Sequence, residues 1–190
     1  MDPQEQRQKQ SELLHPEGIS LKDVFFAARQ HYPEMEPSDL AVPATPRGYK
    51  ITESIYVSHW IPSHNPDFLR AFGIQSILCL DGKLKPEWAE ALGVKKITSL
   101  DIPDGPAFTK HHLLDGVKAL EDLVAHHSPV LVCCHAGQSR SPAIAIGYIA
   151  IHTHVSVKEA LALVRRERAP EREIKIWPSM QEALRRVVTK

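Results

Sequence analysis

The chain is organised around the segment Val130-Leu131-Val132-Cys133-Cys134-His135-Ala136-Gly137-Gln138-Ser139-Arg140-Ser141-Pro142. Its first four residues are apolar and follow Pro129, a pattern that predicts a short, fully buried strand. Small residues come next, and apolar side chains then recur at helical spacing at Ile144, Tyr148 and Ile151. The segment therefore predicts a buried strand, a tight loop and a helix, in that order.

The loop in this segment has the composition of an anion site. Five residues separate Cys134 from Arg140, with Gly137 between them and Ser141 directly after the arginine. Backbone N–H groups of residues 135–140 can curl around one point at the N-terminus of the following helix, where the helix dipole favours an anion. Arg140 can donate two parallel hydrogen bonds to phosphoryl oxygens, and the same positive field favours the thiolate of Cys134.

This pattern resembles the signature of the cysteine-based protein tyrosine phosphatase superfamily, His-Cys-x5-Arg-Ser/Thr, and is most like its dual-specificity branch. The resemblance implies that Cys134 is the nucleophile and that Ser141 donates a hydrogen bond to the cysteine sulfur. It implies no cofactor and no metal. The phosphate-binding loop would comprise His135, Ala136, Gly137, Gln138, Ser139 and Arg140. The simpler alternative is a buried strand cysteine before an ordinary helix N-terminus.

A general acid is expected upstream of the loop. In the family, an aspartate on a neighbouring loop protonates the leaving oxygen and then activates water. Leu100-Asp101-Ile102-Pro103-Asp104 matches the family's pattern, which indicates Asp104 as the acid. Asp101 is the competing candidate, although a solvated loop residue is the simpler interpretation for it.

The two other cysteines raise separate questions. Cys133 stands where the family usually has histidine, so we expect lower activity or activity shifted to higher pH. An oxidised Cys134 could be captured by a nearby thiol, and Cys133 or Cys79 is the possible redox partner. Strand alternation points Cys133 and Cys134 apart, and both partner candidates could simply be small buried hydrophobic residues.

Size and charge limit the class of protein. The chain has 190 residues, with 23 basic and 23 acidic side chains, so neither nucleic acid nor a membrane is an expected partner. Three cysteines do not form a disulfide framework, and the polar N-terminus lacks the apolar core of a signal peptide. We expect a cytoplasmic protein that binds a phosphorylated protein or a small phosphate monoester, and its oligomeric state stays open.

The element pattern predicts an α/β fold with a central, mainly parallel sheet flanked by helices, as in dual-specificity phosphatases. Residues 48–190 form the predicted phosphatase domain, and residues 1–47 an N-terminal extension with an amphipathic helix at 21–31 and a Pro-rich connector at 33–47. The extension is either a packed accessory of the domain or a docking arm. Strands are expected at 49–51, 55–57, 74–80, 94–100 and 130–133. Helices are expected at 66–72 and 86–92, after Thr109, from Ser141, from Ser156 to about 167 and from Pro178.

The expected reaction is hydrolysis of phosphoserine, phosphothreonine and phosphotyrosine in proteins through a phosphocysteine intermediate. Two alternatives stay open. One is a phosphatase of a non-protein substrate, such as an inositol phosphate, a lipid headgroup or an RNA 5′-phosphate. It ranks second because residues 135–139 contain no lysine. The other is a pseudophosphatase that binds phosphorylated partners without turnover.

Overall fold

The computed structural model describes residues 48–168 and 173–188, together with residue 30. Apart from residue 30, the predicted N-terminal helix and the Pro-rich connector lie outside the described residues, so the predicted role of the extension stays a prediction. Within the described part of the chain, no helix is long and apolar enough to cross a membrane.

The centre of the domain is a five-stranded sheet with the order β1-β2-β5-β3-β4. β1 pairs with β2 in antiparallel fashion, and the other neighbouring strands are parallel, which confirms the predicted mainly parallel sheet. The strands are β1 (Gly48–Lys50), β2 (Ile55–Ser58), β3 (Ser76–Cys79), β4 (Lys96–Ser99) and β5 (Val130–Cys133). β5 therefore lies in the middle, with β2 and β3 on either side.

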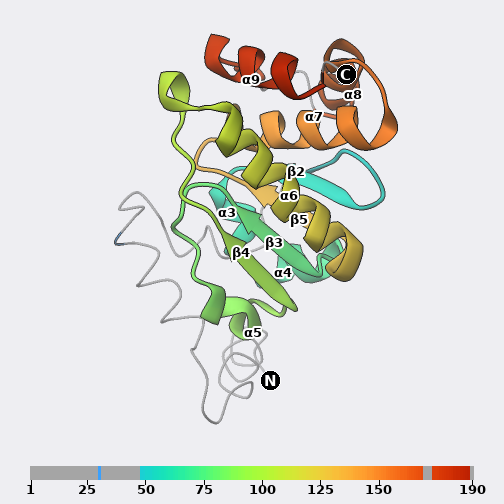
Figure 1. The fold of residues 1–190 in the computed structure, drawn as a ribbon. Coiled ribbons are helices and arrows are strands. Elements are labelled where there is room, and N and C mark those ends of the chain that lie inside the picture. Colours follow the sequence, from blue (N-terminus) through green and yellow to red (C-terminus); the bar gives the residue numbers. More distant parts are fainter. Residues whose placement is uncertain (1–29, 31–47, 169–172, 189–190) are drawn as a thin grey trace, which may run out of the picture.

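Helices cover both faces of the sheet. On one face, a large apolar core is shared with four helices: α6 (Lys110–His127), α7 (Arg140–Thr153), α8 (Val157–Glu167) and α9 (Pro178–Val188). Of these, α7, α8 and α9 lie together at the top of Figure 1. On the other face, a smaller core is shared with short elements: α4 (Pro66–Ala71), the 3-10 helix η2 (Pro86–Trp88) and α5 (Ala89–Leu92).

Local signals in the sequence explain where most helices begin and end. The side chain of Asn65 accepts a hydrogen bond from Phe68 N (3.0 Å) at the start of α4. Thr109 and Ser156 form capping boxes at the starts of α6 and α8. Gly93 ends α5 in the left-handed conformation, with a φ of 72°.

Three local expectations differ from the structure. The sequence predicts that the apolar stripe of α6 comprises Leu113, Leu114, Val117, Leu120 and Val124, but Leu114 is exposed in the structure, whereas Leu123 is fully buried. The short helix α3 (Trp60–Ser63) and the 3-10 turn η3 (Gly105–Ala107) were not expected. Both are single turns between other elements, too short for any apolar periodicity to be visible in the sequence.

Candidate active site

The cysteine loop connects the central strand β5 to α7, as predicted. Cys134 follows the carboxyl end of β5 and is 1% exposed, while His135 and Ala136 face solvent. In a parallel sheet this edge is where ligands bind. Gly137 has a φ of 67°, and a Cβ there would lie 2.6 Å from the backbone nitrogen of His59. Glycine is therefore required to seat the loop against the end of β2.

Ser141 lies directly beside the candidate nucleophile. Its hydroxyl oxygen is 3.3 Å from Cys134 Sγ, and it is also 3.3 Å from the carbonyl oxygen of Ser58, to which it donates. The hydroxyl has only one proton. A Cys134 thiolate would attract that proton, so this geometry suits the predicted hydrogen bond to the sulfur.

Arg140 is buried at the first position of α7 and is held by two backbone carbonyls. Its Nη1 donates to the oxygens of Leu80 (3.3 Å) and Ile102 (3.1 Å), which follow β3 and β4. Its Nε is buried and has no hydrogen-bond partner among the described residues. The nearest acid, Asp104 Oδ2, is 3.7 Å away, an ion-pair distance that is too long for a hydrogen bond. A buried donor with unused capacity beside the loop fits an anion.

Asp104 reaches the same loop from another part of the chain. Its Oδ1 accepts from Gly105 N (2.8 Å) at the start of η3. Ser139 Oγ lies 2.8 Å from both carboxylate oxygens, so its single proton is shared between them. Asp101 is exposed, and its backbone instead pairs with that of Asp81 in an isolated antiparallel β-bridge. The structure therefore brings Asp104 to the loop, as expected of the acid, whose role stays a prediction.

The hydrogen bond from Ser139 could not be predicted from the sequence. The sequence places Ser139 in the predicted phosphate-binding loop, where its small side chain suits the loop geometry, but indicates no partner for its hydroxyl. Its partner Asp104 is 35 positions away in the chain, and no local pattern marks the contact.

Cys79 and Cys133 lie together on the other face of the sheet. They are direct partners in the β3–β5 ladder and belong to the smaller core, whereas Cys134 belongs to the larger one. Cys79 Sγ donates to Asp81 Oδ1 at 3.0 Å. Contact with the Cys79 thiol and burial raise the pKa of Cys133 well above its ordinary value. The structure pairs these two thiols with each other and not with Cys134, and their redox role stays a prediction.

Comparison with known proteins agrees with this arrangement. The family described as dual specificity phosphatase, catalytic domain, matches residues 55–184. A probable serine/threonine-protein kinase of Dictyostelium discoideum is 32% identical over 123 residues, which are 63% of this chain and only 5% of that protein. The chain thus spans a small part of this relative, whose kinase name does not carry over.

Two solved structures show the same fold. DUSP15 is 19% identical with a TM-score of 0.64, over 75% of this chain and 87% of that one. PTPMT1 in complex with PI(5)P is 20% identical with a TM-score of 0.61, over 75% of this chain and 95% of that one. At these identities the likeness concerns the fold alone.

Proposed function

The chain belongs to the dual-specificity phosphatase family, and on this basis we propose that it hydrolyses phosphotyrosine, phosphoserine and phosphothreonine in proteins through a phosphocysteine at Cys134. The observation that carries the proposal is the juxtaposition at one loop of a buried thiol, a serine hydroxyl and a buried guanidinium with an unused Nε. These are the groups that a thiolate-based phosphoryl transfer needs in one place.

In the first step, the Cys134 thiolate attacks phosphorus and the bond from phosphorus to the ester oxygen breaks. Asp104 gives its proton to the departing oxygen, so the product leaves as an alcohol or phenol. Arg140 and the loop N–H groups bind the transferring phosphoryl oxygens, whose charge is spread over three equatorial positions.

In the second step, water attacks the phosphocysteine and Asp104, now ionised, takes a proton from it. The sulfur–phosphorus bond breaks, inorganic phosphate forms and Cys134 leaves as a thiolate. Ser141 is 3.3 Å from this sulfur and can donate its proton to the developing negative charge. The enzyme then returns to its starting state.

A second candidate substrate class is a non-protein monoester that carries further negative charge. Residues 135–139 contain no lysine, but the backbone N–H of Lys175 donates to Gln138 O of the loop (2.8 Å), and its side chain is exposed. One exposed cationic side chain thus lies next to the loop, in contact with the Trp177 ring. PTPMT1, which shares the fold, has been solved with PI(5)P. Comparing kcat/KM for phosphotyrosine, phosphoserine and phosphothreonine peptides with that for phosphatidylinositol phosphates separates the classes. Higher values for the lipids would contradict the protein assignment.

Asp104→Asn tests the acid directly. We expect kcat to fall by roughly 10²–10⁴-fold on phosphate esters with poor leaving groups, the usual contribution of a positioned acid, and much less on good leaving groups. Asp101→Asn is the matched control, because it removes the same charge from the same loop. If Asp101→Asn shows the leaving-group dependence and Asp104→Asn does not, the assignment is wrong.

A further inference from the structure

The segment 174–179, called the strap below, leads into α9, includes the first two residues of that helix and contacts both loops of the site. The backbone N–H of Lys175 donates to Gln138 O in the cysteine loop, at 2.8 Å. Ser179 Oγ donates to Gly105 O, directly after Asp104, also at 2.8 Å. One short segment is therefore hydrogen-bonded to the loop of the candidate nucleophile and to the loop of the candidate acid.

Trp177, in the same strap, packs against the acid loop. Gly105 has a φ of 67°, and the position that a Cβ would take there lies 3.8 Å from Cε2 of the indole. The Lys175 ammonium lies 4.2 Å from the centre of the indole ring, a cation–π contact that fixes the ring. The indole N–H is buried and has no hydrogen-bond partner in the described part of the chain, so the ring acts on Gly105 by packing.

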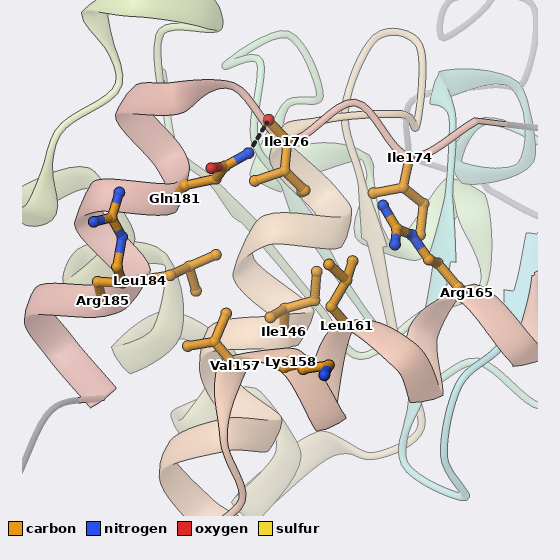
Figure 2. Close-up of a pocket in the computed structure, with 10 residues that line it drawn as sticks. All are labelled: Ile146, Val157, Lys158, Leu161, Arg165, Ile174, Ile176, Gln181, Leu184 and Arg185. Atoms are coloured by element: carbon orange, nitrogen blue, oxygen red, sulfur yellow. Dashed lines mark hydrogen bonds between the residues drawn. The ribbon is translucent and has the colours of Figure 1, made fainter.

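The helical layer anchors the strap from behind. A cavity of about 380 Å³ lies among residues of α7, α8 and α9, and no residue of the cysteine loop lines it. Ile174 and Ile176 of the strap line this cavity (Figure 2). Gln181 in α9 donates to Ile176 O at 3.2 Å, the dashed line in Figure 2. Ile174 is buried. The strap is thus attached to a packed layer and presents its contacts to the two loops from there.

We infer that Trp177 and Ser179 are positioning residues for the general acid. Gly105 donates its N–H to the Asp104 carboxylate, so a shift of Gly105 moves the carboxylate away from Ser139 and the loop. The strap holds Gly105 through one hydrogen bond and one aromatic contact while it holds Gln138 in the facing loop. It therefore sets the position of the acid relative to Cys134. This inference rests on the proposed function and deepens it.

The test is the dependence of kcat/KM on the leaving group over a series of aryl phosphates, for Ser179→Ala and Trp177→Phe. Each variant weakens one contact to Gly105. We expect a loss of roughly three- to tenfold on poor leaving groups, as for one hydrogen bond, and less than about twofold on good ones. Ser156→Ala is the control: this serine caps α8, its hydroxyl is hydrogen-bonded to Glu159 and not to Gly105, and its loss should leave the leaving-group dependence unchanged.

Equal losses on good and poor leaving groups would overturn the inference, because the strap would then support the fold or the phosphate loop and not the acid. No loss in either variant would overturn it as well. Adding Ser179→Ala to Asp104→Asn should cause no further leaving-group-dependent loss, since both changes remove the same proton transfer. If the loss in kcat/KM of Asp104→Asn does not depend on the leaving group, Asp104 is not the acid, and the inference about the strap fails with that assignment. If the loss in Asp104→Asn depends on the leaving group while the losses in the strap variants do not, the inference about the strap is refuted and the assignment of the acid stands.

Discussion

Cys133 directly precedes the candidate nucleophile, yet its side chain lies in the smaller core on the opposite face of the sheet. Strand alternation alone requires this placement. The side chain that contacts Cys134 Sγ by a hydrogen bond is that of Ser141, which comes from the first turn of α7. At the scale of single residues, the hydrogen-bond partner of the Cys134 sulfur therefore comes from the helix after the loop and not from the strand before it.

His64 provides a residue-scale prediction for pH. It is buried beside the end of α3, where its Nδ1 lies 2.9 Å from Trp60 O. Burial lowers the pKa of His64 from 6.5 to about 4. Between these values the unfolded chain binds a proton that the folded protein does not, so the free energy of unfolding falls as the pH falls from about 7 to 4, by about 3 kcal/mol.

Urea unfolding of the wild type and of His64→Asn at about pH 7 and pH 4.5 measures this contribution. The variant should lose most of it, because asparagine does not titrate but can still donate to the Trp60 carbonyl. His111→Asn, which removes an exposed histidine, should keep it. The same pH dependence in the wild type and His64→Asn would disprove the explanation.

At the scale of elements, the cysteine loop is shaped by its contact with the end of β2. A Cβ at Gly137 would lie 2.6 Å from His59 N and 2.8 Å from Ser58 C, both backbone atoms that cannot move aside cheaply. Trp60 N also donates to His135 O, at 3.3 Å. The loop is thus fitted to β2 and α3 from one side and bonded to the strap from the other.

Gly137→Ala should therefore reduce phosphatase activity by more than about tenfold, because the loop must shift and with it the N–H groups that are proposed to bind the phosphoryl oxygens. Gly93→Ala is the matched control: Gly93 also has a positive φ, of 72°, but nothing lies within 4 Å of the added Cβ. It should cost roughly 1 kcal/mol of stability and leave activity unchanged. Aryl phosphate hydrolysis and thermal unfolding of both variants check this, and equal activity losses would rule out the packing argument.

For the whole molecule, the parts that could be predicted from the sequence are those that local signals determine. The five strands, the caps at Asn65, Thr109 and Ser156, and the loop from Cys134 to Arg140 all follow from periodicity, turn residues or spacing. The contacts that assemble the site do not, because they join segments far apart in the chain. Ser139 meets Asp104 across 35 positions, and Ser179 meets Gly105 across 74.

The measurement that tests the central claim most directly is trapping of the phosphocysteine. Asp104→Asn should accumulate the intermediate on an aryl phosphate with a good leaving group, because attack by the thiolate needs little acid while hydrolysis of the intermediate lacks its base. Rapid quenching, digestion and peptide mass analysis locate the phosphoryl group, with Asp104→Asn combined with Cys134→Ser as the control. We predict one phosphoryl group on the peptide that contains Cys134 and none in the control. Undiminished turnover in the single variant Cys134→Ser, or a phosphoryl group on another residue, would contradict the account.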